Sequence, residues 1–96
     1  MKKFVVSFSA LALDDVEAAF DYYEHVQAGL GQRFTAQLQL TLNAIKRNPF
    51  FASVRYDNIR CAQLKKFPFL VHYHVDEENF AITIIAVYST HKEPFG

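Results

Sequence analysis

Basic, histidine and tyrosine side chains in the second half of the sequence are the residue types best suited to chemistry on a phosphodiester. A metal-free site of this kind needs a general base, a general acid and a cation beside the crowded phosphate. If the strands that carry these side chains are neighbours, some converge at one end of a sheet. The alternative is ordinary charge at a sheet edge, where lysines guard against aggregation. The candidates are Arg60, Lys65, Lys66, Tyr73, Tyr88, His91 and Lys92.

Two histidines raise the question of a metal site. His72 and His74 are two residues apart in an expected strand, so their side chains would share one face, as metal ligands require. A zinc site also needs a third ligand, which only His91 or an acid from elsewhere supplies. We favour a polar, solvent-facing stripe opposite a buried face formed by Phe69, Val71, Tyr73 and Val75. The sequence therefore predicts no metal and no cofactor.

Phenylalanine is abundant, with ten residues in a chain of 96. Some of these rings must be core. An excess on a poorly covered flank of the sheet would form an apolar patch, and such patches mark partner surfaces. We therefore expect the free protein to self-associate. The candidate partner-binding residues are Phe50, Phe51, Phe67, Phe69 and Phe95.

Apolar residues at three- and four-residue spacing predict two helices ahead of these side chains. The first runs from Ala10 to about Gln27, and Gly29-Leu30-Gly31 breaks it. The second begins near Leu30 and ends before Pro49, because the residue preceding a proline avoids the helical region. So short a break predicts an antiparallel helical hairpin. The expected apolar faces are Leu13, Val16, Phe20 and Tyr23 in the first helix, and Leu30, Phe34, Leu38, Leu42 and Ile45 in the second.

The N-terminus allows two interpretations. Met1-Lys2-Lys3 followed by an apolar run has the layout of a secretory signal. The other interpretation, which we favour, is a strand from Lys3 to Phe8 and then a helix capped by the Ser9 hydroxyl.

After Pro49 the apolar period changes from 3.6 to 2. We expect a loop over 50–57 and strands over 58–65, 69–75 and 80–88, with a turn at 76–79. The last strand is apolar on both faces, which favours a central position. The predicted fold class is α+β with the order β-α-α-β-β-β, a helical hairpin packed on a mostly antiparallel four-stranded sheet.

Composition limits the class of protein. Residues 1–96 are enough for a single domain, and no linker or repeat is visible. Ten Lys and Arg balance ten Asp and Glu, which argues against a protein that coats nucleic acid by bulk charge. Cys61 is the only cysteine, so no internal disulfide forms and we expect a cytoplasmic protein. No stretch is long and apolar enough to span a membrane.

Several motifs resemble the RelE/ParE superfamily of bacterial toxins from type II toxin–antitoxin systems, also called plasmid stabilisation proteins, and together they cover nearly the whole chain. They occur in order, on the expected elements: Ser9-Ala10-x-Ala12-x-x-Asp15, Tyr22-Tyr23, Gly29-Leu30-Gly31-x-x-Phe34, Ile59-Arg60-x-x-x-Leu64-x-x-Phe67-Pro68-Phe69-Leu70-Val71-x-Tyr73, and Ala86-Val87-Tyr88-x-x-His91-Lys92-x-Pro94.

The resemblance implies a growth-inhibiting toxin that a cognate antitoxin protein binds and silences. One branch of the superfamily cleaves mRNA on the ribosome, and the ParE-like branch poisons DNA gyrase. Phe69 stands where the nuclease pattern has an arginine, and Phe67-Pro68-Phe69 and the His91-Lys92-x-Pro94 ending resemble the ParE-like side. The chain ends at Gly96, so we expect no catalytic residue on a longer tail. Neutral net charge also favours this branch.

Three alternatives follow from the resemblance. The favoured one is a ParE-like toxin that binds gyrase. The second is a metal-independent ribonuclease acting on ribosome-bound mRNA, with His91 as acid or base, Arg60 and Lys65 or Lys66 on the phosphate, and Tyr88 completing the site. The third is a degenerate toxin that keeps only its partner-binding surface.

Overall fold

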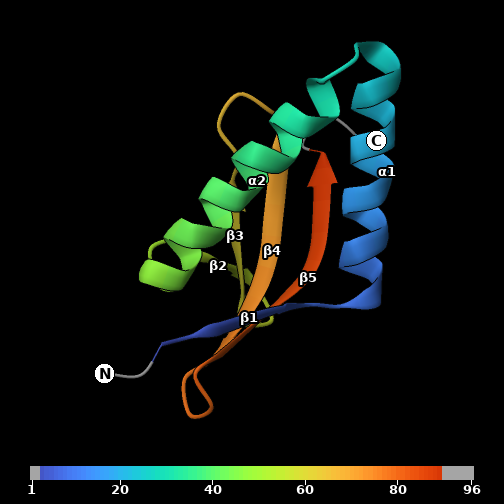
Figure 1. Cartoon of the computed structure of the whole chain (residues 1–96). Helices are drawn as coiled ribbons and strands as arrows, with labels where there is room; N and C mark the ends of the chain where they lie inside the picture. Colours follow the sequence, from blue (N-terminus) through green and yellow to red (C-terminus); the bar gives the residue numbers. More distant parts are fainter. Residues whose placement is uncertain (1–2, 90–96) are drawn as a thin grey trace.

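Two helices and five strands make up residues 3–89, the part of the chain that the computed structural model describes. Their order is β1 (Val5–Phe8), α1 (Ala10–Val26), α2 (Leu30–Arg47), β2 (Val54–Tyr56), β3 (Ile59–Gln63), β4 (Phe69–Asp76) and β5 (Ala81–Ser89). Both helices lie on one side of the sheet, with α2 crossing its face and α1 running beside β5 (Figure 1).

The strands form a single sheet in the order β1-β5-β4-β3-β2. Strands β1 and β5 are parallel, and all other neighbours are antiparallel. The predicted α+β class and element order are confirmed, and β5 is an interior strand as expected. The strand count differs, because the sheet has five strands where the sequence predicted four.

The additional strand is β2, which lies inside the segment expected to be a loop. It pairs with β3 through a two-residue turn, Asp57-Asn58, in which both residues have positive φ, 43° and 62°. This is the requirement of a type I′ hairpin turn, which Asn-Gly or Asp-Gly usually meets. Without a glycine the Asp-Asn pair does not stand out in the sequence.

Strand β1 lies at the sheet edge, so the strand interpretation of the N-terminus is confirmed. The Ser9 hydroxyl accepts a hydrogen bond from the Ala12 N–H at 3.1 Å and donates one to the Ile85 carbonyl at 3.2 Å. Past the end of β1, the Asp15 carboxylate accepts a bond from the Val87 N–H at 2.9 Å. The start of α1 therefore satisfies polar groups of β5 that β1 is too short to reach.

Helix α1 packs through smaller residues than expected. Ala12 and Ala19 are buried, whereas Leu13, which the sequence analysis placed on the buried face, is 55% exposed. The remaining residues of the predicted face are part-buried, and Val16 and Tyr23 pack against the core, so only the position of Leu13 was predicted wrongly. Alanine side chains allow the helix backbone to lie close to β5, which a row of leucines would prevent.

Helix α2 buries the predicted line of Phe34, Leu38, Leu42 and Ile45. The hairpin turn is fixed by Glu24, whose carboxylate accepts hydrogen bonds from the N–H groups of Gly29 at 3.3 Å and Gly31 at 2.7 Å. These N–H groups lie at the start of α2 and have no partner within the helix. Within residues 3–89, no helix has the length and apolar character needed to cross a bilayer.

Candidate functional site

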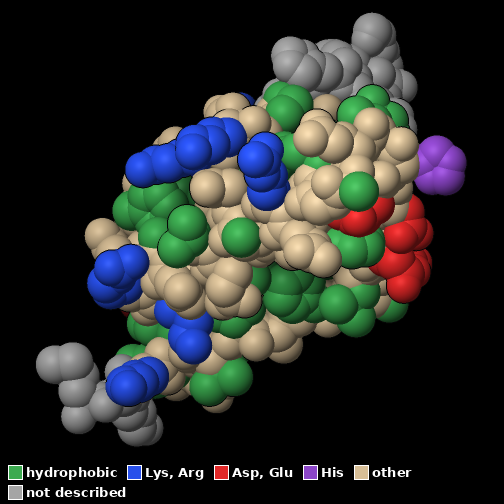
Figure 2. Space-filling model, turned by 45° about the horizontal axis from the view of Figure 1, so that its top comes forward, with side chains coloured by type: hydrophobic (Ala, Val, Ile, Leu, Met, Phe, Trp, Pro, Cys, Tyr) green, Lys and Arg blue, Asp and Glu red, His purple; other side chains and the backbone are tan. Residues whose placement is uncertain are grey.

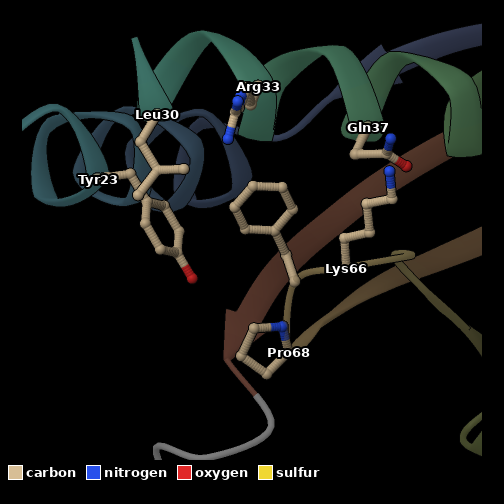
Figure 3. Close-up of a pocket in the computed structure, with 7 residues that line it drawn as sticks. Tyr23, Leu30, Arg33, Gln37, Lys66 and Pro68 are labelled. Atoms are coloured by element: carbon tan, nitrogen blue, oxygen red, sulfur yellow. The ribbon is translucent and has the colours of Figure 1, made fainter. Parts of the chain in front are cut away.

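A groove lies between the start of α2 and the loop that joins β3 to β4. It has a volume of about 620 Å³, within the range of ligand sites in proteins. Tyr23 and Leu30 line one end, and the side chain of Lys66 rises from the loop toward Gln37 on α2 (Figure 3). The lining residues are Tyr23, Leu30, Arg33, Gln37, Lys66, Phe67 and Pro68.

Four aromatic rings in edge-on and tilted contact form the wall beneath this groove. Tyr23 lies 5.0 Å from Phe67 and 5.6 Å from Phe34, and Phe34 lies 5.0 Å from Phe69, between ring centroids. Phe34 and Phe69 are buried in the core, whereas Tyr23 and Phe67 are half-buried and reach the groove. The cluster joins α1, α2, the β3–β4 loop and β4, so the groove wall is continuous with the core and rigid.

The charges on the groove have one sign. Arg33 and Lys66 are exposed at its rim, and none of the lining residues is acidic. An apolar floor bordered by cations fits an amphipathic segment whose polar side is acidic.

Lys66 adopts a backbone conformation that its side chain disfavours. Its φ is 70°, in the left-handed region, where a residue other than glycine costs roughly 1–2 kcal/mol. Strained residues of this kind cluster at binding and active sites. Lys66 therefore combines a disfavoured backbone conformation with an exposed ammonium group at the groove rim.

We expect Lys66→Gly to raise the free energy of unfolding by about 0.5–1 kcal/mol, because glycine tolerates positive φ and the relief exceeds its greater entropy in the unfolded chain. Urea titration measures this. Lys65→Gly is the control, since Lys65 does not have positive φ, and it should destabilise or leave stability unchanged. A loss of stability in Lys66→Gly would contradict the assignment of strain.

A second cluster lies on the sheet face opposite the helices. His72 Nδ1 is 2.9 Å from the Tyr56 hydroxyl and 3.3 Å from the Cys61 sulfur, and the Tyr88 ring meets the imidazole edge-on at 5.0 Å. His72 is only 8% exposed, so its assignment to a solvent-facing stripe with His74 is wrong; His74 alone is exposed. Its partner Tyr56 could not be foreseen because β2 was unrecognised, and Cys61 could not because the register between β3 and β4 is not visible in the sequence. Among residues 3–89, no three His, Cys, Asp or Glu side chains gather as a metal would require.

His72 is held in its neutral form. Burial lowers its pKa below the ordinary value of 6.5, the nearby Arg55 lowers it further, and Asp15 opposes the shift weakly. Burial likewise raises the pKa of the Cys61 thiol and of the Tyr56 hydroxyl. All three groups are therefore uncharged near neutrality. His72 Nε2 is buried without a hydrogen-bond partner, which costs free energy of folding.

The lowered pKa of His72 predicts a pH-dependent stability. The unfolded state binds the proton more readily than the folded state, so this contribution is complete above about pH 7 and is lost as the pH falls below 6.5 toward the folded-state pKa. We expect the pH dependence of thermal unfolding between pH 7 and 5 to become flatter in His72→Gln. The control His74→Gln, on the same strand, should retain the wild-type slope. Equal slopes in wild type and His72→Gln would contradict this prediction.

Arg60, the main cationic candidate for phosphate chemistry, is bound to backbone. Its guanidinium donates hydrogen bonds to the carbonyls of Ala52 at 2.6 Å and Phe50 at 3.4 Å, and lies 5.1 Å from the centre of the Phe50 ring. Nearby, the buried hydroxyl of Tyr73 donates to the Pro49 carbonyl at 2.8 Å. Both side chains therefore hold the segment that follows α2 against the sheet.

Of the other phosphodiester candidates in the described residues, Tyr73 lies beside Arg60, but its hydroxyl is bound to the Pro49 carbonyl, and Tyr88 lies on the other face of the sheet. Arg60 pairs with Tyr73 and so lies on the helix-covered side of the sheet, whereas Tyr88 contacts His72 on the opposite face. Lys65 is exposed in the β3–β4 loop. His91 and Lys92 lie outside the described residues.

The five candidate partner-binding phenylalanines have different positions. Phe50 and Phe51, after α2, are 42% and 51% exposed. Phe67 lines the groove, whereas Phe69 is 9% exposed, which confirms its expected place on the buried face of the strand and leaves little of its ring for a partner. Phe95 lies outside the described residues. Of these phenylalanines, Phe67 and Phe69 belong to the aromatic cluster at the groove, and Phe50 and Phe51 to the segment after α2 that Arg60 holds.

Comparison with known proteins gives one family match. A family model described as the ParE toxin of the type II toxin–antitoxin system, parDE, matches residues 6–94. No curated protein matches the chain significantly.

Solved structures with a similar fold include chains from ParDE and RelBE toxin–antitoxin systems. The chromosomal ParDE system from P. aeruginosa superposes with a TM-score of 0.77 at 13% identity, covering 90% of this chain and 95% of the other. A chain of the intact E. coli RelBE toxin–antitoxin complex gives a TM-score of 0.70 at 19% identity, with 92% and 96% covered. A chain of the toxin–antitoxin complex RelBE2 from Mycobacterium tuberculosis gives 0.66 at 15%, with 93% of each covered. At these identities the similarity establishes the fold.

Proposed function

Because the chain belongs to the ParE toxin family of type II toxin–antitoxin systems, we propose that it arrests bacterial growth in the cytoplasm by binding DNA gyrase, and that a cognate antitoxin neutralises it. The family match covers most of the chain, from residue 6 to residue 94. Two of the structural relatives are toxin–antitoxin complexes, which supports an antitoxin partner here.

The groove beside α2 is the proposed antitoxin site. Its apolar floor of Tyr23, Leu30 and Phe67 offers pockets for the anchors of an amphipathic helix or strand. Arg33 and Lys66 favour a segment with acidic residues between those anchors. Because the floor is rigid, little conformational entropy is lost on the toxin side when the segment binds.

One observation favours gyrase binding over RNA cleavage. Arg60 and Tyr88, the two candidates of the nuclease alternative whose faces of the sheet are defined, lie on opposite faces, and the Arg60 guanidinium is occupied by the Ala52 and Phe50 carbonyls. A phosphate held by Arg60 would lie across the sheet from Tyr88. General acid–base catalysis needs its groups within hydrogen-bond reach of one reacting atom.

The proposal is tested with purified protein in two assays. We expect inhibition of DNA supercoiling by gyrase, and intact mRNA in a translating extract at the same toxin concentration. Cleaved mRNA together with unaffected supercoiling would overturn the gyrase proposal and restore the ribonuclease alternative.

We expect Arg60→Ala to act on stability rather than on chemistry. The variant leaves the carbonyls of Ala52 and Phe50 without their donor, so the free energy of unfolding should fall by about 1–3 kcal/mol. Growth inhibition per folded molecule, measured at a temperature where the variant stays folded, should remain near wild type. Lys65→Ala, at an exposed cation, is the matched control for lost charge. Loss of toxicity in a folded Arg60→Ala would favour the nuclease alternative.

A further inference from the structure

One flank of α1 exposes a row of apolar side chains that the groove does not include. We define the α1 flank as Leu11, Ala18, Tyr22 and Val26, whose spacing of seven and four residues places them along one side of the helix. The three large side chains are 56%, 63% and 59% exposed. Ala18, Tyr22 and Val26, together with Asp21 and His25, also line a shallow hollow of about 460 Å³.

Tyr22 is already fixed in position, although it is the most exposed member of the α1 flank. Its ring meets that of Tyr23 edge-on, with 5.2 Å between centroids and 71° between planes. Tyr23 in turn packs on Phe34 and Phe67. An aromatic side chain that is exposed but ordered loses little entropy on binding, and such residues are the usual anchors of protein interfaces.

The charges around the α1 flank are opposite to those around the groove. Asp14, Glu17 and Asp21 are exposed on the neighbouring side of the helix, and residues 4–32 contain no Lys or Arg. On the face of the molecule in Figure 2, the acidic side chains gather at the right and the Lys and Arg side chains lie at the left. The neutral net charge therefore conceals a local excess of acids on this side of α1.

We propose that the α1 flank is a docking surface for a basic amphipathic helix of the protein that this toxin inhibits. The apolar side of such a helix would cover Leu11, Tyr22 and Val26, and its lysines or arginines would lie against Asp14 and Asp21. This inference rests on the proposed toxin function and not on the identity of the target. The proposed antitoxin and the inhibited protein therefore bind surfaces of opposite charge. The basic groove binds an acidic segment of the antitoxin, and the acidic α1 flank binds a basic helix of the inhibited protein.

A second copy of the chain is a poorer occupant. In a two-fold symmetric contact, the same patch meets itself. The acids of one α1 would then face the acids of the other, and like charges across an interface are repulsive. A partner of opposite charge has no such penalty and gains a faster, salt-dependent association.

The binding test uses a fluorescein-labelled peptide of Leu and Lys at amphipathic-helix spacing as the probe, and a Leu and Glu peptide of the same pattern as its counterpart. We expect fluorescence anisotropy to show binding of the first and not the second at the α1 flank. Amide chemical-shift changes on adding the first peptide should concentrate in residues 11–26. Shift changes confined to the groove residues on adding the first peptide would overturn the proposal, as would shift changes concentrated in residues 11–26 on adding the second.

Two variants test the named contacts. Tyr22→Ala and Asp21→Lys should each weaken binding of the Leu and Lys peptide by about tenfold or more. Leu40→Ala, which truncates a 60% exposed side chain on α2, and Glu78→Lys, which reverses an exposed acid in the β4–β5 turn, are the matched controls and should bind like wild type. Equal effects of test and control variants would overturn the assignment to this surface. Self-association of the free chain in light scattering that Tyr22→Ala abolishes would place a second copy on this flank and would also contradict the proposal.

A growth assay separates this inference from the proposed target. Tyr22→Ala and Asp21→Lys should reduce growth inhibition about tenfold while antitoxin co-expression still protects cells from the residual toxicity. If the wild type arrests growth without affecting gyrase, the gyrase proposal fails and the two variants still test the α1 flank. Full toxicity in folded Tyr22→Ala and Asp21→Lys would overturn the inference even if gyrase is the target.

Discussion

Reversing the two cations of the groove, in the double variant Arg33→Glu and Lys66→Glu, is expected to weaken antitoxin binding about 100-fold at low salt. Each reversal replaces an attraction toward an acidic segment by a repulsion, and unfavourable charge pairs across an interface cost several kcal/mol. Both side chains are exposed, so the fold should be retained. The measurement is the dissociation constant for the cognate antitoxin, determined as a function of salt.

A growth assay tests the same charge reversal in cells. Cells that co-express the double variant and the antitoxin should stop growing, because the toxin keeps its target surface and escapes neutralisation. The control Lys3→Glu and Lys46→Glu makes the same change in net charge at exposed positions outside the groove, and should remain neutralised. Equal antitoxin affinity in the wild type and the groove variant would contradict the assignment of the groove to the antitoxin.

Phe34→Ala is expected to lower the free energy of unfolding by about 3–5 kcal/mol, a large share of the stability of a domain this size. Phe34 is fully buried, and its ring contacts those of Tyr23, Phe67 and Phe69. Removing it leaves a cavity under the groove wall that these rigid neighbours fill only in part. Chemical denaturation followed by far-UV circular dichroism measures the loss.

Leu40→Ala is the matched control for Phe34→Ala, because Leu40 lies on the same helix but is 60% exposed. We expect its effect to be below about 0.5 kcal/mol, as is usual for surface substitutions. A small effect of Phe34→Ala would mean that the four-ring cluster is not the core of this region. Phe34→Leu, which retains part of the volume, should fall between the two.

Local sequence signals predicted the elements well because each depends on neighbouring residues. Helix α2 was predicted from its apolar period and from Pro49, and the Ser9 cap from residue type alone; both were confirmed. The wrong predictions concern which side chains are buried, because burial depends on contacts with residues far away in the sequence. Leu13 is exposed because β5 approaches α1 along Ala12 and Ala19, and no local pattern in α1 contains that information.

The candidate site shows the same division. Arg60 and Lys66 were selected as cations, but their different roles depend on what the fold places beside them. Arg60 meets backbone carbonyls eight and ten residues earlier in the chain, whereas Lys66 stands free at a groove rim with positive φ. The burial of His72 likewise depends on distant residues, because β2 places Tyr56 against the imidazole.

The sequence by itself determined a small α+β domain with one cysteine, its two helices, most of its strands and, through motifs in order, its toxin family. These properties are set by composition and by periodicity within single elements. Only the tertiary structure decided which faces are buried, where the groove lies and how the balanced charges divide between α1 and the groove side. Sheet register and helix packing join residues far apart in the chain, so a net charge of zero describes the molecule but not its surfaces.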